Sequence, residues 1–173
     1  LYISYKPVVL DGYLYGISAS TWFWLAITSP VGHQIYVWLM WRCELYLRLF
    51  SGKLGAKQAF NIYAVGFSFL FISRLIMIIF LAISSKNTLP LNPVYAYILA
   101  AMITPLVIFL FYSVKKYFTI ERAYGVDHFN ENYNEPYVKK GIFKYTDNGM
   151  YVFGLMVLYL PGLLFLSEAA LLV

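Results

Sequence analysis

The sequence predicts an all-α integral membrane protein: a bundle of about five transmembrane helices, with a cytoplasmic loop–helix segment before the last one. Three observations lead to this fold class: the composition, the lengths of the apolar stretches and the one-sided distribution of basic residues. Of the 173 residues, 61% are hydrophobic and 12% are charged. Soluble domains are about half apolar and about a quarter charged. The surplus of apolar residues therefore indicates a membrane protein.

The apolar residues form five stretches, each near the length of about 20 residues that crosses a hydrocarbon core as a helix. The stretches cover residues 12–29, 33–50, 59–83, 94–114 and 149–173. The second stretch is the least apolar, because it includes Arg42, Glu44 and Arg48. Residues 1–173 are expected to form one domain of a longer chain, since the first residue is not Met and the last lies in an apolar stretch.

The joints between the stretches are short, with one exception. Pro30 and Gly32 predict a tight hairpin between the first two stretches. Pro105 and Pro161 predict kinks in the fourth and fifth helices. The exception is the polar segment 115–148, which holds most of the acidic residues. This segment is expected to begin as an extension of the fourth helix and to continue as a turn-rich loop.

Basic residues gather on one face of this five-span arrangement. The N-terminus and residues 51–57 and 115–148 share that face, which holds Lys6, Arg48, Lys53, Lys57, Lys115, Lys116, Arg122, Lys139, Lys140 and Lys144. The other face has only Lys86. Lys and Arg favour the cytoplasmic side, so segment 115–148 is expected in the cytoplasm, at a bacterial inner membrane or an endoplasmic reticulum membrane. The net charge of +5 then matches an anionic lipid surface and not a nucleic acid.

Two charged residues lie inside the apolar stretches. Arg74 is in the third stretch and Glu168 in the fifth. Because a charge inside a membrane is costly, each is a hypothetical functional residue. The two interpretations left open are contact with substrate and mutual pairing.

The segment 141–154, with the sequence GIFKYTDNGMYVFG, places a glycine turn and a polar group directly before the last apolar stretch. Asp147 or Asn148 is expected to cap the helix that follows, because Asp and Asn side chains accept hydrogen bonds from first-turn N–H groups. The same N–H groups attract a carboxylate. No metal site is expected.

This motif segment resembles two related families of membrane enzymes. Asp147, Asn148, Gly149, Met150 and Tyr151, with Gly154 beyond, are similar to the D-N-P-M-Y-x-G motif of phosphatidylethanolamine N-methyltransferases. The upstream sequence GIFKY is similar to the G-[L/I]-[Y/F]-x-Y element of isoprenylcysteine carboxyl methyltransferases. The resemblance implies S-adenosylmethionine as cofactor, bound by Gly141, Tyr145, Asp147, Asn148, Tyr151 and Gly154.

The sequence departs from these families at several points. Gly149 stands in place of proline, and the Asp147-Asn148 pair replaces the Arg-His pair of the carboxyl methyltransferases. The lipid-amine family is therefore the better match. The Gly-x-Gly element of that family is not found, and its acidic, tyrosine-rich tail corresponds to positions after Val173.

The predicted function is S-adenosylmethionine-dependent methylation of a lipid or lipid-like amine at the cytoplasmic membrane face. Methyl transfer needs a positioned, neutral amine. The catalytic candidates are His128 and Asp127, since histidine is the side chain most often used as a general base. The candidates for substrate binding are Arg122, Glu131 and Tyr133, since a carboxylate attracts an ammonium group and an aromatic face binds cations. The purely structural alternatives are that His128 bonds only water and that Asp147 and Asn148 only cap a helix.

Two other functions stay open. The first is a carboxyl O-methyltransferase of the isoprenylcysteine type, acting on a prenylated or other lipophilic acid. Its ionised oxygen would prefer a cationic pocket formed by Arg122, Lys139 and Lys140. The second is a non-enzymatic membrane subunit or small transporter, in which polar groups line the middle of the bundle.

Overall fold

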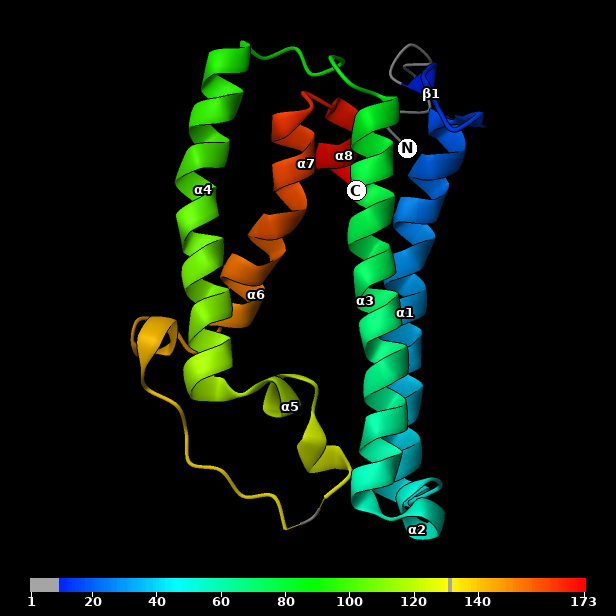
Figure 1. The fold of residues 1–173 in the computed structure, drawn as a ribbon, viewed down its shortest axis with the longest axis vertical. Coiled ribbons are helices and arrows are strands. Elements are labelled where there is room, and N and C mark those ends of the chain that lie inside the picture. Colours follow the sequence, from blue (N-terminus) through cyan, green and yellow to red (C-terminus); the bar gives the residue numbers. More distant parts are fainter. Residues whose placement is uncertain (1–9, 131) are drawn as a thin grey trace.

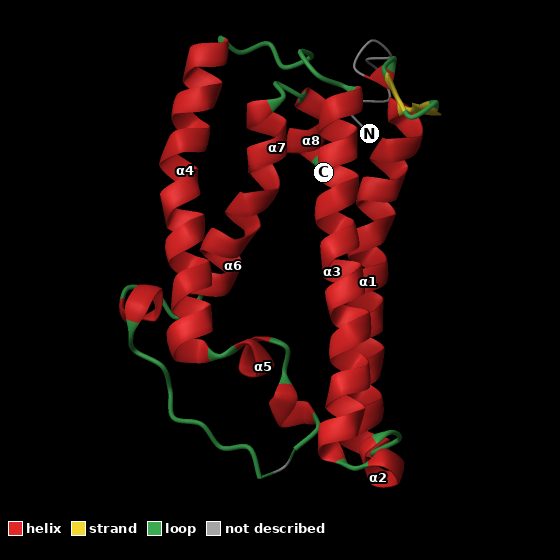
Figure 2. Ribbon diagram, in the orientation of Figure 1, coloured by secondary structure: helices red, strands yellow, loops and turns green. Residues whose placement is uncertain are grey.

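The computed structural model describes residues 10–130 and 132–173, and it is mostly helical (Figures 1 and 2). Three long helices form the frame: α1 (Ala19–Leu47), α3 (Ala56–Ser84) and α4 (Pro93–Ser113). A short hairpin of β1 (Tyr13–Leu14) and β2 (Ile17–Ser18) precedes α1. The short helix α2 (Ser51–Leu54) turns the chain from α1 into α3.

The expected hairpin at Pro30 and Gly32 is wrong, because both residues lie inside the continuous helix α1. The first two apolar stretches therefore share one helix of 29 residues, and five crossings are not observed. Helix α1 packs along α3, which has the same length (Figure 1). A hydrogen bond of 3.1 Å joins the hydroxyls of Ser29 and Ser73 across this pair, beside the proline. Packing against a neighbour is what makes a proline tolerable in a long apolar helix.

Helix α4 continues through the π-helical turn η3 (Val114–Phe118). The chain then forms the short turns α5 (Ile120–Ala123) and η4 (Val126–His128), and later η5 (Gly141–Lys144). Segment 115–148 thus begins as an extension of the fourth helix, as expected. It goes on to cross from the end of α4 to the end of α3 and back (Figure 1).

The last apolar stretch is interrupted. It consists of α6 (Gly149–Gly154), the 3-10 turn η6 (Leu155–Leu158), α7 (Tyr159–Leu164) and α8 (Glu168–Leu172). Pro161 has no N–H to donate to the carbonyl of Val157, and its ring crowds that group, so an irregular turn before it is expected. The chain turns at Leu166, where φ is +54°. Residues 149–173 were expected to form one transmembrane helix with a kink at Pro161; the structure divides them into several short helical segments instead.

Two helical segments are long and apolar enough to cross a membrane: Ala56–Ser84 and Pro93–Phe118. Only 17% and 22% of their most apolar windows are buried inside the protein. Large apolar side chains such as Val65, Phe69 and Ile108 point outward. Such extensive exposed apolar surface is typical of proteins that face lipid.

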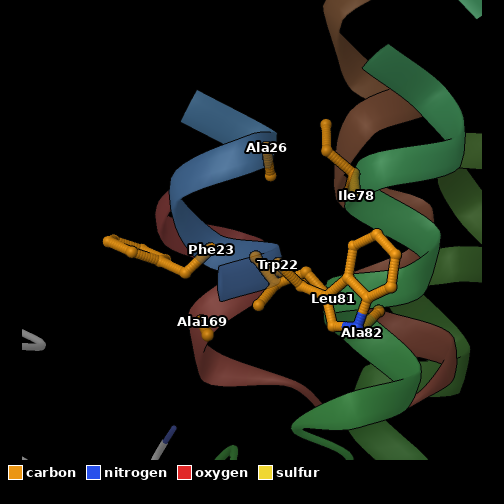
Figure 3. Close-up of a cluster of buried hydrophobic side chains, with 8 residues drawn as sticks. Trp22, Phe23, Ala26, Ile78, Leu81, Ala82 and Ala169 are labelled. Carbon is orange, nitrogen blue, oxygen red and sulfur yellow. The ribbon is translucent and has the colours of Figure 1, made fainter. Parts of the chain in front are cut away.

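The helices form two groups, α1 with α3 and α4 with the short helices α6 and α7 (Figure 1). One end of the molecule is closed by a cluster that joins α1, α3 and α8 and contains Trp22, Phe23, Ala26, Ile78, Leu81, Ala82 and Ala169 (Figure 3). At the other end, Phe129 after η4 packs against Phe60 and Tyr63 of α3. Between these two ends the groups diverge.

The end of the molecule that contains α2 and segment 115–148 (Figure 1) holds most of the basic residues, together with most of the acidic ones. We call it the basic end. Lys53 lies on α2, Arg122 on α5 and Lys144 on η5. In the described part of the chain, Lys86 is the basic residue of the opposite end, and Lys6 lies outside the described residues. The sequence predicted that the N-terminus lies on the same face as the basic end. Because α1 is a single helix, its N-terminal end lies at the opposite end of the molecule instead.

Candidate functional site

A cavity of about 320 Å³ lies between the two helix groups. We call it the core cavity. Its walls come from α3, the end of α4, α5 and the α6–η6 segment, with the lining residues Phe67, Phe71, Arg74, Leu110, Phe111, Val114, Ile120, Ala123, Tyr124, Met150, Tyr151, Gly154, Leu155, Val157 and Leu158. Almost all of this lining is apolar. Its volume is at the lower end of the range for small-molecule sites, about 300–1,000 Å³.

Arg74 is the one charged residue in this lining among the described residues. Its side chain is half-buried, and its Nε atom is buried without a hydrogen-bond partner. No ion pair joins it to an acid within the described part of the chain. The expected partner, Glu168, begins α8 beyond the C-terminal end of α3, where its backbone N–H donates to the Thr88 hydroxyl at 3.1 Å. The pairing of Arg74 with Glu168 is therefore not observed.

His33 of α1 lies behind the cavity wall. Its ring contacts the rings of Phe67 and Phe71, with centroids 4.7 and 6.1 Å away. Both ring nitrogens are buried without hydrogen-bond partners in the described structure. His33 and Arg74 interact electrostatically, but neither supplies a negative charge to the other. The middle of the α1–α3 pair therefore contains a positively charged guanidinium and an imidazole, each with buried nitrogen atoms that have no hydrogen-bond partner in the described structure.

A second, polar cavity of about 250 Å³ lies at the basic end, between α1, α2 and η4. We call it the polar pocket; its lining residues are Glu44, Leu45, Arg48, Ser51, Gly52, Ala56, Asp127, His128, Phe129, Asn130 and Asn132. Glu44 is only 2% exposed. Its carboxylate accepts hydrogen bonds from the backbone N–H groups of Phe50 and Ser51, at 2.7 and 3.1 Å. Glu44 therefore fixes the turn that leads into α2.

The two catalytic candidates lie together in the polar pocket. Nδ1 of His128 is 3.4 Å from Oδ1 of Asp127, a contact that is electrostatic when the imidazole is protonated and lacks hydrogen-bond geometry. The His128 ring stacks on Trp41 of α1, with centroids 4.2 Å apart and planes 16° apart. This stack attaches η4 to α1, so His128 has a structural role.

Tyr124 joins segment 115–148 to α3 beside the core cavity. Its ring lines the core cavity and packs on Phe67 at 4.1 Å between centroids. Its hydroxyl shares a hydrogen bond of 3.1 Å with the hydroxyl of Ser68. The chain continues through Gly125 into η4, which contributes Asp127 and His128 to the lining of the polar pocket. Tyr124 thus anchors segment 115–148 to α3 at the wall of the core cavity.

The first part of the motif segment is attached to the end of α4. Gly141 has a φ of +60°, and a side chain there would collide with Ser113 and Tyr117. The buried hydroxyl of Ser113 accepts a hydrogen bond of 3.0 Å from the backbone N–H of Ile142. This close approach explains glycine at position 141 without a cofactor.

The middle of the motif segment is on the surface. Tyr145 is 77% exposed, and Asp147 and Asn148 are also exposed. Asn148 occupies the N-cap position of α6, but neither it nor Asp147 forms the expected side-chain capping bond, so that prediction is wrong. The Asp147 carboxylate instead interacts with Tyr137 and raises the pKa of its phenol. Because the Asp147 side chain is directed to Tyr137, it does not accept a hydrogen bond from the first turn of α6.

The end of the motif segment reaches the core cavity. Tyr151 and Gly154 both line it, together with Met150. A Cβ atom at position 154 would lie 3.5 Å from the Leu110 side chain, an ordinary contact distance, so a larger side chain there would extend along the cavity wall. Of the six predicted cofactor residues, the structure therefore brings Tyr151 and Gly154 to the cavity, while Gly141, Tyr145, Asp147 and Asn148 line neither cavity.

The substrate candidates do not converge. The Arg122 guanidinium donates to the carbonyl of Pro136 at 2.9 Å and lies over the Phe118 ring. Tyr133 is half-buried, and its backbone N–H donates to the carbonyl of Asn130. Neither residue lines the core cavity or the polar pocket, and Glu131 lies outside the described residues. Arg122 and Tyr133 are best explained as supports of segment 115–148.

Several residues of the site were missed by the sequence patterns. Glu44 and Ser113 were assigned no role, and His33 was treated as part of a helix end. The available signal was the presence of a polar side chain inside an apolar stretch, which is the signal that did single out Arg74. No group of three or more His, Cys, Asp and Glu residues is arranged to hold a metal ion in the described chain.

Comparison of the chain with protein-family models, curated proteins and solved structures finds no match in any of the three.

Proposed function

We propose that the protein is a multi-pass membrane methyltransferase that uses S-adenosylmethionine to methylate a lipid or lipid-like amine at the cytoplasmic face. The observation that supports this most is that Tyr151 and Gly154 of the motif segment form a wall of the core cavity. The resemblance of residues 141–154 to lipid methyltransferases was identified from sequence alone. An apolar cavity beside those residues is what a lipid acceptor would need.

In this proposal Tyr151 and Gly154 would hold the cofactor, whose sulfonium group supplies an electrophilic methyl group. The protein positions the acceptor and excludes water from it. The apolar lining of the core cavity would keep an amine neutral, because burial disfavours the charged form. A neutral amine is the nucleophile that this reaction requires. Asp127 and His128 line a different cavity, so they are given no part in proton transfer at the acceptor.

The carboxyl methyltransferase alternative depended on Arg122, Lys139 and Lys140. None of the three lines the core cavity, so these residues do not support that alternative. The preference for an amine acceptor rests on the resemblance of residues 147–151 to the lipid-amine family. The two reactions give products of different chemistry: an N-methyl group is stable to base, whereas a methyl ester releases methanol.

The experiment is transfer of labelled methyl from S-adenosylmethionine into a membrane lipid extract by the purified full chain. We expect a labelled lipid from which base does not release the labelled methyl group as methanol. Tyr151→Ala should lower turnover about a hundredfold by removing cofactor positioning. The matched control Tyr159→Ala, a half-exposed tyrosine outside the cavity lining, should stay within about threefold. If the protein neither binds S-adenosylmethionine nor labels a lipid, the proposed methyltransferase activity is wrong. If base releases the label as methanol, the acceptor is a carboxylate and not an amine.

The proposed orientation places the basic end in the cytoplasm. We would replace Cys43, the single cysteine, by Ser and compare two reporters, Tyr145→Cys at the basic end and Lys86→Cys at the other. A membrane-impermeant maleimide added to intact cells should label Lys86→Cys and not Tyr145→Cys. The reverse pattern would place the motif segment outside the cell, away from the methyl donor.

A further inference from the structure

The core cavity combines two properties that are rarely found together: an apolar lining and one unpaired positive charge. Arg74 is the nineteenth of the 29 residues of α3, about 15 Å along the helix from Ser84. It lies in a segment whose length and composition suit a membrane. A buried or membrane-embedded charge is normally paired, and the described residues provide Arg74 with no acidic partner.

The positions on α3 show how a ligand would lie. Phe67, Phe71 and Arg74 follow one another at intervals of four and three residues and line the same cavity, as expected for one face of a helix. From Phe67 to Arg74 the face extends about 10 Å. Leu110 and Val114 of α4 and Leu155 of η6 complete the apolar part of the lining. A hydrocarbon chain along this face would bring its charged end to Arg74.

We propose that the core cavity binds a lipid carboxylate, with the negative group on the Arg74 guanidinium and the chain along the apolar lining. A guanidinium binds a carboxylate through two parallel hydrogen bonds. A carboxylate has one negative charge, which a single arginine neutralises. A phosphate monoester has about −1.5 to −2 charges and would require a second cation, which the lining does not contain among the described residues.

The inference goes beyond the proposed function, because it concerns which lipids the cavity binds. A lipid carboxylate bound there would compete with the amine acceptor for the core cavity. Binding is measured without cofactor, so a failure to bind and a failure to transfer methyl groups are distinguishable.

The test uses the full chain in phosphatidylcholine nanodiscs and radiolabelled palmitate, with hexadecanol and a palmitoyl lysophosphatidate as competitors. We expect palmitate to bind at least about tenfold more tightly than hexadecanol, and Arg74→Met to remove that preference. The matched control Lys53→Met removes a cation on α2, outside the cavity, and should change the palmitate affinity by less than about twofold.

Two further measurements keep the result interpretable if Arg74→Met does not fold. Gly154→Leu places a side chain against the cavity wall near Leu110 and should abolish palmitate binding while Arg74 stays intact. A diazirine-bearing palmitate should label residues 67–74 and 150–158 in the wild-type protein. Equal affinity for palmitate and hexadecanol, unchanged binding in Arg74→Met, or labelling elsewhere would overturn the proposal. Tighter binding of the lysophosphatidate than of palmitate would overturn the choice of carboxylate.

Discussion

The core cavity and the polar pocket differ in how they satisfy their charges. In the polar pocket, the Glu44 carboxylate accepts two backbone hydrogen bonds, and Asp127 lies 3.4 Å from His128, whose Nδ1 atom has no hydrogen-bond partner. In the core cavity, Arg74 faces apolar side chains and has no acidic partner in the described structure. A buried polar group with complete partners stabilises a fold, whereas one without partners is a candidate for ligand binding. The comparison therefore separates a structural site from a recognition site, although both contain charged residues.

The largest expected effect tests the structural character of the polar pocket. Glu44→Ala leaves two backbone N–H groups without their charged acceptor, and hydrogen bonds to charged groups contribute about 1.5–3 kcal/mol each. We expect a loss of about 4 kcal/mol in unfolding free energy, measured by chemical denaturation in detergent. Glu135→Ala, at an exposed acid of the loop, should cost less than about 0.5 kcal/mol. Equal stability of the two variants would show that Glu44 does not anchor the pocket.

The second effect tests whether the motif segment is one site or two. Gly141→Ala forces a side chain into a left-handed conformation and against Ser113, at a cost of about 3 kcal/mol. Gly32→Ala in α1 meets no atom within 4 Å and should stabilise the helix by about 0.5–1 kcal/mol. If Gly141→Ala unfolds like the wild type but loses cofactor binding, Gly141 belongs to the recognition site after all.

The smallest effect concerns His128. His128→Ala removes the stack on Trp41 and should cost about 1 kcal/mol of unfolding free energy. Because His128 lines the polar pocket, turnover should fall much less than in Tyr151→Ala. General-base catalysis contributes about 10²–10⁴-fold, so a loss of that size at unchanged stability would restore His128 as the base and connect the two cavities.

The sequence was sufficient for the features that depend on local composition. The lengths of α3 and α4 follow from uninterrupted apolar stretches, because such a stretch satisfies its backbone within the helix wherever it lies. The basic character of one end follows from the spacing of Lys and Arg between those stretches. The disruption before Pro161 follows from the missing N–H and the proline ring.

Tertiary packing decided the rest. Pro30 and Gly32 have the composition of a turn, yet α1 continues through them because α3 lies alongside; a local pattern contains no information about that neighbour. The motif segment is continuous in sequence, but Gly141 is attached to Ser113 while Tyr151 and Gly154 line the core cavity. Arg74 could be recognised from sequence as a costly charge. Arg74 lines a cavity and does not meet Glu168, because the two helix groups diverge beside it. That divergence depends on packing between side chains that are far apart in the sequence.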